Sequence, residues 1–202
     1  MARRNDHSRE ELKTMILDAA WNITGDEGFS AVTARRIARA IGYTPGTIYN
    51  VFTSMDDVLI ALCARVVDEL SAMITLPSHY DPAARPDHNL KIMARLYRRY
   101  ASDHLHHWML LFGYNLTEST QVPEWYNEKI ALLFDPLEQM ISPLFAPGGE
   151  RRKKIAARIL WSSVHGLCFL EATRKIPFIT DYADPEEMMD YMIDGFISGI
   201  GR

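Results

Sequence analysis

The chain has 202 residues, of which 48% are hydrophobic and 24% are charged, so it can bury a sizeable core in one large or two small domains. No apolar run is long enough to cross a bilayer, and residues 1–13 lack the apolar core of a secretory signal. We therefore expect a cytoplasmic protein with no membrane partner. Cys63 and Cys168 lie far apart among apolar neighbours, which predicts buried free thiols and excludes a disulfide framework.

The net charge of −4 is unevenly distributed along the chain. Residues 1–55 hold seven Lys and Arg against six Asp and Glu, a balance of +1, which leaves −5 for the remainder. Positive charge near the amino terminus gathers at Arg3, Arg4 and Arg9 and again at residues 35–39. This modest basic footprint favours a protein that uses two copies to hold one nucleic-acid site over a non-specific DNA coater.

The first predicted helix begins after Ser8, whose hydroxyl can form a capping box with Glu11. Apolar residues then recur at helical spacing until Gly25 or Gly28 ends the helix. Arg3 and Arg4 precede this cap, as part of either a disordered tail or an arm that reaches phosphates.

Residues 33–52 predict two short helices around a tight turn. Thr33 is a good N-cap for the first helix, and Gly42 can adopt the left-handed conformation that ends it. Thr44 then offers a capping hydroxyl and Pro45 takes the first helical position, while Ile48 faces back toward the first helix. This is the helix-turn-helix pattern, although similar corners occur in many all-α proteins.

The second of these helices would enter the DNA major groove and present its first turn to bases and phosphates. The predicted DNA-binding residues are Thr33, Arg35, Arg36, Thr44, Pro45, Gly46, Thr47, Tyr49 and Asn50.

The segments on either side of this corner resemble those of the tetracycline-repressor (TetR) family of bacterial regulators. Residues 28–33 read GFSAVT, residues 48–52 read IYNVF, and residues 54–59 read SMDDVL. The resemblance covers residues 12–62, and residues 161–166, WSSVHG, resemble a Trp…His-Gly element in the ligand domain of one branch of the family. It implies DNA binding by a dimer that responds to a ligand.

Two positions depart from the family pattern. Family members commonly carry a histidine where this chain has Val51, and a phosphate-binding lysine where it has Met55. Loss of the lysine removes one phosphate contact and should weaken DNA affinity and its salt dependence.

A long amphipathic helix is expected from residue 54 until Pro77, joining the DNA-binding domain to the rest of the chain. Three prolines mark residues 76–86 as a loop. These features predict an all-α fold with a three-helix DNA-binding domain at residues 1–55 and a ligand-binding and dimerisation domain at residues 56–202.

The middle helices are rich in aromatic and thioether side chains. Residues 104–115 are so apolar that we expect burial on every side, and further helices follow Asp87 and Pro123. Such side chains either fill a core or line a pocket for a small hydrophobic effector, and the family resemblance favours the pocket. The predicted ligand-binding residues are Met93, Tyr97, Trp108, Phe112, Trp125, Tyr126, Trp161, His165 and Phe169.

The last two predicted helices occupy residues 151–175 and the segment after Pro185. The first is rich in small residues, and the second has an apolar surface broader than one neighbour would cover. Two helices from each of two subunits would form a four-helix bundle, as the family resemblance also implies. The alternative is an intramolecular bundle in a monomer.

No nucleophile and base pair, phosphate loop or metal motif of recognised spacing occurs, so we expect no enzymatic activity, cofactor or metal. Asp103 and His107 are four residues apart and could share a metal, but no further ligand follows at helical spacing. The leading hypothesis is a homodimeric repressor of a palindromic operator, released by a small hydrophobic or aromatic effector. The alternative is a DNA-organising or division-related factor with the same DNA-binding domain and no small-molecule response.

Overall fold

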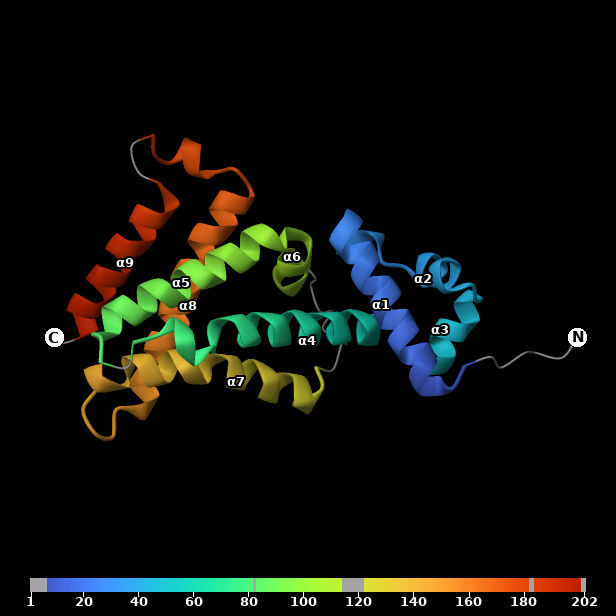
Figure 1. The fold of residues 1–202 in the computed structure, drawn as a ribbon, viewed down its shortest axis with the longest axis horizontal. Coiled ribbons are helices and arrows are strands. Elements are labelled where there is room, and N and C mark those ends of the chain that lie inside the picture. Colours follow the sequence, from blue (N-terminus) through green and yellow to red (C-terminus); the bar gives the residue numbers. More distant parts are fainter. Residues whose placement is uncertain (1–6, 82, 114–121, 182–183, 201–202) are drawn as a thin grey trace, which may run out of the picture. The chain divides into compact units, whose positions relative to one another are not determined.

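The computed structural model describes residues 7–81, 83–113, 122–181 and 184–200. These residues form nine α-helices and no strand, which confirms the all-α prediction (Figure 1). The helices are α1 Arg9–Glu27, α2 Ala34–Ile41, α3 Pro45–Val51, α4 Met55–Ile74, α5 Pro86–Asp103, α6 Leu105–Gly113, α7 Glu124–Ile141, α8 Glu150–Ala172 and α9 Pro185–Ile200. Short 3₁₀ turns, η1 Phe29–Ala31, η2 Pro77–His79, η3 Ser142–Leu144 and η4 Ile176–Phe178, follow α1, α4, α7 and α8.

Local signals fix the ends of the first helices. The Ser8 hydroxyl accepts from the Glu11 backbone N–H and the Glu11 carboxylate accepts from the Ser8 N–H, so the predicted capping box is present. Gly28 ends α1 with a φ of 83°. Ser54 and Asp57 exchange the same pair of bonds at the start of α4, at 2.9 and 3.2 Å. Arg3 and Arg4 lie outside the described residues.

The chain divides into two compact units, one of residues 1–68 and 104–127 and the other of residues 69–103 and 128–202. The core of the first unit joins α1, α2 and α3 to the start of α4 and to α6. Its fully buried members include Ile16, Ile37, Ile48, Leu62 and Leu110. By packing, this unit extends beyond residue 55, because apolar residues of α4 and α6 complete its core.

Helix α6 is only partly covered. Trp108 and Leu110 are fully buried, but Leu105 is 36% exposed. The expectation of burial on every side for residues 104–115 is therefore wrong, because the apolar character of a segment does not determine which of its sides neighbouring helices cover. Residues 114 and 115 lie outside the described residues.

In the second unit α5, α8 and α9 pack together (Figure 1). Basic residues of α5 pair with acidic residues of α9: Lys91 with Asp194 at 2.7 Å, and Arg95 with Glu186 at 2.6 Å and with Asp190 at 2.7 Å. Arg98 holds Glu171 of α8 through two hydrogen bonds of 2.6 and 2.8 Å. The pairs are partly exposed, so they fix the register of the helices more than they add stability.

Candidate DNA-binding surface and ligand cavity

The helix-turn-helix of α2 and α3 forms largely as the sequence predicts. The Thr33 hydroxyl accepts from the Arg36 N–H at 3.3 Å and caps α2. Gly42 ends α2 in the left-handed region, with φ 75° and ψ 26°. Ile48 is fully buried against α1 and α2. These three features confirm the predicted Thr33 cap, the glycine turn and the apolar anchor.

The start of α3 differs in one detail. Pro45 occupies its first turn, but the Thr44 side chain makes no capping hydrogen bond, so the predicted capping hydroxyl is wrong. The hydroxyls of Thr44 and Thr47 instead lie 3.3 Å apart, which draws the Thr44 oxygen away from the backbone N–H groups. Thr47 itself is buried at 9% exposure, so its side chain faces the core of the domain.

The other predicted residues of the turn and of α3 face solvent. Tyr49 is 53% exposed, and Thr44, Pro45, Gly46 and Asn50 are exposed. Helix α3 therefore has one apolar side held in the domain and one polar side available to a DNA groove.

The two predicted arginines of α2 differ in their partners. Arg35 is exposed. Arg36 makes a bidentate ion pair with Glu27 at the end of α1, in which one N–O distance is 2.8 Å. This hydrogen bonding lowers the pKa of Glu27 and raises that of Arg36. The guanidinium that sequence analysis assigned to DNA is thus shared with a carboxylate of the same chain.

Sequence reasoning missed two contacts that attach the amino-terminal segment to this surface. The imidazole of His7 lies 2.7 Å from the Tyr43 hydroxyl, and Arg9 donates to the backbone carbonyl of Val51 at 3.3 Å. The second bond caps the last turn of α3 with a cation. Val51 and Met55, the two departures from the family pattern, pack against the core of the domain.

Helix α6 holds the last turns of α1 through two histidines. Nδ1 of His106 lies 2.7 Å from the Gly25 carbonyl oxygen, and Nε2 of His107 lies 3.0 Å from that of Trp21. A carbonyl only accepts, so both ring nitrogens donate. The guanidinium of Arg65 also lies over the Trp21 ring, with its Cζ 4.2 Å from the ring centroid. Among the described residues no three His, Cys, Asp or Glu side chains are grouped to hold a metal ion.

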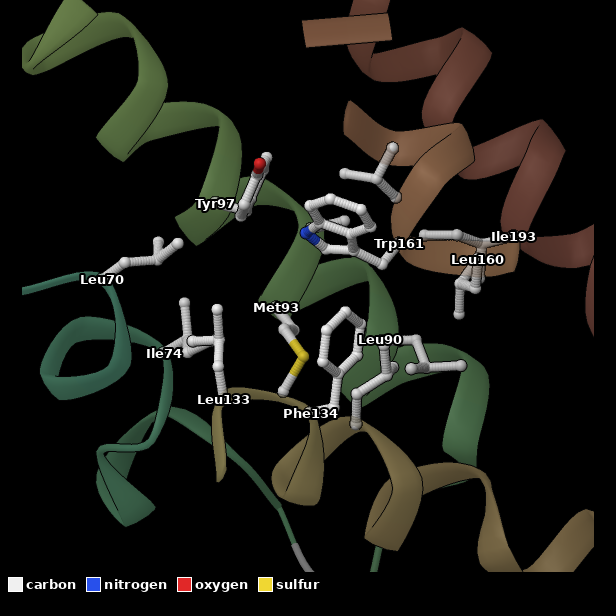
Figure 2. A pocket seen from close by; sticks show the side chains of 13 residues that line it. Leu70, Ile74, Leu90, Met93, Tyr97, Leu133, Phe134, Leu160, Trp161 and Ile193 are labelled. Atoms are coloured by element: carbon white, nitrogen blue, oxygen red, sulfur yellow. The ribbon is translucent and has the colours of Figure 1, made fainter. Parts of the chain in front are cut away.

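The second unit contains an apolar cavity of about 50 Å³ (Figure 2). In Figure 2, Met93 of α5, Phe134 of α7 and Trp161 of α8 gather around it. Its lining is contributed by α4, α5, α7, α8 and α9: Leu70, Ile74, Leu90, Met93, Ala94, Tyr97, Leu133, Phe134, Leu137, Leu160, Trp161, Val164 and Ile193. None of these lining residues is an Asp, Glu, His, Lys or Arg.

The cavity includes some of the predicted ligand-binding residues. Met93, Tyr97 and Trp161 line it. His165 does not line the cavity but contacts two residues that do. Its Nδ1 lies 3.0 Å from the Tyr97 hydroxyl, and its ring stacks on that of Trp161 with the ring centroids 5.4 Å apart. The Phe169 ring lies 6.4 Å from that of His165. Burial lowers the pKa of His165, which favours the neutral imidazole.

The remaining four predicted residues belong to the first unit and do not line this cavity. Trp108 is fully buried and contacts the Phe112 ring at 5.4 Å. Tyr126 packs against the core that contains α1–α3, near Cys63, and Trp125 is 48% exposed. Burial raises the pKa of the Cys63 thiol to about 12 and also that of Cys168 to about 12, and both thiols are free, as predicted.

Comparisons with known proteins agree with this architecture. Residues 16–62 match the family model described as bacterial regulatory proteins, tetR family, and residues 90–196 match the tetracyclin repressor-like C-terminal domain. An uncharacterised helix-turn-helix-type transcriptional regulator of Mycobacterium tuberculosis is 25% identical over 190 residues, which cover 93% of this chain and 80% of the relative.

Solved structures share the fold. A protein of unknown function from Rhodococcus sp. RHA1 matches with a TM-score of 0.73 and 18% identity, over 100% of both chains. A transcriptional regulator of Streptomyces coelicolor, described as a TetR, matches with a TM-score of 0.66 and 18% identity, over 96% of this chain and 98% of the other. No helix within the described residues has the length and apolarity that a membrane span requires.

Proposed function

Because the chain belongs to the TetR family of bacterial transcriptional regulators, we propose that it is a homodimeric repressor of a palindromic DNA operator, released by a small hydrophobic or aromatic effector. It acts in the cytoplasm. The observation that carries the proposal is that the two sides of α3 differ. Ile48 on one side is fully buried, whereas Tyr49 and Asn50 on the other side are exposed. The domain thus presents a rigid helix whose outward side chains are suited to base edges and phosphates.

The surfaces of α8 and α9 support the dimer. Ile155 is 45% exposed and Ile159 is 53% exposed. A methyl group built on Gly166, Gly195 or Gly199 would meet no atom within 4 Å. Glycine in a helix costs about 1 kcal/mol relative to alanine, so three glycines with open space above them fit a face that a second copy approaches closely.

The properties of the cavity support the proposal of a small hydrophobic effector. Its lining is largely apolar and includes no Asp, Glu, His, Lys or Arg, and the hydroxyl of Tyr97, paired with the neutral His165, provides one polar contact at its edge. A cavity of about 50 Å³ accepts only a few heavy atoms, so a larger effector requires flexible side chains such as Met93 to move.

The position of helix α4 supports the proposal that DNA binding and effector binding are coupled. Its first half supplies Val58 and Leu62 to the core beneath the helix-turn-helix, and its second half supplies Leu70 and Ile74 to the cavity wall. An effector that enlarges the cavity moves a helix shared by both units. Release follows only when the effector binds the DNA-free state more tightly than the DNA-bound state.

The test begins with selection of an operator from a random duplex library, followed by fluorescence anisotropy with heparin as competitor. The Tyr49→Ala variant should bind the selected operator about fivefold or more weakly, because one base contact contributes roughly 1–3 kcal/mol. Its thermal unfolding should match the wild type, since Tyr49 is exposed. Unchanged operator affinity in this variant would refute the assignment of α3.

A screen of hydrophobic ligands then separates the two functions considered from sequence. Ligand-dependent loss of operator binding supports the repressor. A protein that binds its operator as a dimer and ignores every ligand in a broad screen would instead be the DNA-organising factor.

A further inference from the structure

A second hollow adjoins the apolar cavity in the same unit. It is open to solvent, has a volume of about 660 Å³, and lies among the end of α4, the segment that follows it, the start of α5 and the second half of α7. Thr75, Tyr80, Asn89 and Gln139 contribute polar groups to it.

The two hollows are neighbours along three helices or helix ends. In each case the residue that lines one hollow is next in sequence to a residue that lines the other: Ile74 and Thr75, Asn89 and Leu90, and Pro136 and Leu137. Consecutive Cα atoms are about 3.8 Å apart, so the two linings come close together at all three places. The inner cavity and the outer hollow are therefore neighbours.

The outer hollow offers hydrogen-bond acceptors. The Thr75 hydroxyl donates to the Ser71 carbonyl at 2.8 Å, and the Tyr80 hydroxyl donates to the Ile74 carbonyl. With their protons engaged, both hydroxyl oxygens retain lone pairs. The Asn89 amide oxygen accepts from the Asp81 backbone N–H at 3.1 Å, and its nitrogen donates to the Asp81 carbonyl at 2.8 Å. Asn89 therefore fixes the segment around Asp81 that borders the hollow.

Charge is missing from both linings. No residue lining either hollow is an Asp, Glu, Lys, Arg or His. A carboxylate, phosphate or ammonium group would meet no opposite charge in either lining and would still lose part of its water on entry, whereas a hydroxyl or amide N–H is satisfied by the available acceptors.

We propose that the effector is an uncharged amphiphile, whose hydrocarbon part fills the inner cavity and whose hydroxyl- or amide-bearing head lies in the outer hollow between Thr75 and Tyr80. This inference rests on the proposed function, which it extends by naming the chemical class of the effector and a second subsite for it.

The test uses the full-length protein and four six-carbon probes near neutral pH: hexan-1-ol, hexanoate, hexylammonium and 1-chlorohexane. Isothermal titration calorimetry should show hexan-1-ol binding about tenfold or more tightly than either charged probe, since each of these leaves a charge unpaired. Equal or tighter binding of hexanoate would overturn the proposal.

Substitutions locate the two parts of the site. Ala94→Leu and Val164→Leu each fill the inner cavity and should abolish binding of both hexan-1-ol and 1-chlorohexane. Thr75→Val combined with Tyr80→Phe removes the acceptors and should weaken hexan-1-ol severalfold while 1-chlorohexane binds as before. Circular dichroism and thermal unfolding establish that each variant is folded.

Thr173→Val is the matched control for Thr75. The Thr173 hydroxyl donates to the Phe169 carbonyl at 2.7 Å, the same bond to the fourth preceding residue, at the end of α8 and outside both hollows. It should leave hexan-1-ol affinity unchanged, and an equal loss in this control would overturn the outer subsite.

Operator binding separates this inference from the proposed function. If hexan-1-ol binds as described but operator affinity is unaffected, the class of ligand and its two subsites stand and the ligand-released repressor falls. If the operator is released by another ligand while none of the six-carbon probes binds wild-type protein, the repressor stands and this inference falls.

Discussion

The ring of His107 stacks on that of Trp21, with centroids 3.8 Å apart and planes inclined by 18°. The same imidazole donates to the backbone carbonyl of Trp21, so one side chain of α6 contacts both the ring and the backbone of one residue of α1. Arg65 of α4 approaches the Trp21 ring at 4.2 Å and binds Asp18 at 3.0 Å. Three helices of the first unit therefore meet at Trp21.

Gly25 is required by this contact. A Cβ at residue 25 would lie 2.8 Å from Cε1 of His107. We predict that Gly25→Ala lowers the free energy of unfolding by roughly 1–3 kcal/mol through overpacking, and that His107→Ala also lowers it by roughly 1–3 kcal/mol through loss of the hydrogen bond. Urea denaturation measures both changes.

The double variant shows whether the two residues interact. In the His107→Ala background, Gly25→Ala should be nearly neutral, because the clashing ring is gone, so the two effects are far from additive. His88→Ala, a substitution of an exposed histidine on α5, is the control and should leave stability unchanged. Additive losses would show that the ring and the glycine do not constrain each other.

The ion pair between Glu27 and Arg36 engages the guanidinium that we propose for a DNA phosphate, so we expect it to restrain DNA binding. We predict that Glu27→Gln raises operator affinity and increases the salt dependence of binding by about one phosphate contact. Anisotropy titrations at several salt concentrations measure both quantities.

Asp26→Asn is the control for this substitution. It makes the same change of net charge at the neighbouring exposed residue without touching the ion pair. If it raises affinity as much as Glu27→Gln, the effect is general electrostatics and Arg36 is not released onto a phosphate.

Local features of the chain were predictable because they depend on nearby residues. The capping box at Ser8 and the left-handed Gly42 follow from residue type and spacing alone, and both are present. The partners of His106 and His107 are backbone carbonyls 81 and 86 residues away. Carbonyls carry no signature in a sequence, so the pattern indicated a possible metal ligand and gave no sign of a contact with α1.

The cavity was predictable only in part for a related reason. Aromatic and methionine side chains pointed to Met93, Tyr97 and Trp161, which line it, but equally to Trp108, which is in the other unit. Most of the lining is aliphatic, as at Leu133 and Leu160. Aliphatic residues on the buried side of a helix look the same in sequence whether they face a cavity or another side chain.

The neutral state of His165 makes stability depend on pH. Burial lowers its pKa below the ordinary 6.5, so between the folded and unfolded values the unfolded chain binds more protons. Its contribution to stability is therefore present above the unfolded pKa and is lost as pH falls through the folded pKa. We predict that His165→Gln, which cannot titrate, loses less stability than wild type on acidification from about pH 7.5 to about pH 5.5. Urea denaturation at the two pH values measures this, and identical losses would contradict it.

The exposed glycines of α9 provide the sharpest test of the dimer. A Cβ added at residue 195 or 199 meets nothing within 4 Å in one chain, so we expect Gly195→Leu to leave the fold of the subunit intact and to obstruct only a partner that approaches this face. We predict a monomer by light scattering, with operator affinity reduced by orders of magnitude because each half-site is then bound alone.

Leu132→Glu is the control for this prediction: it changes an exposed residue of α7, 65% accessible, and should leave the dimer intact. Retention of a dimer in Gly195→Leu would place the subunit interface elsewhere, since a face that tolerates four added carbon atoms is not closely packed against another helix.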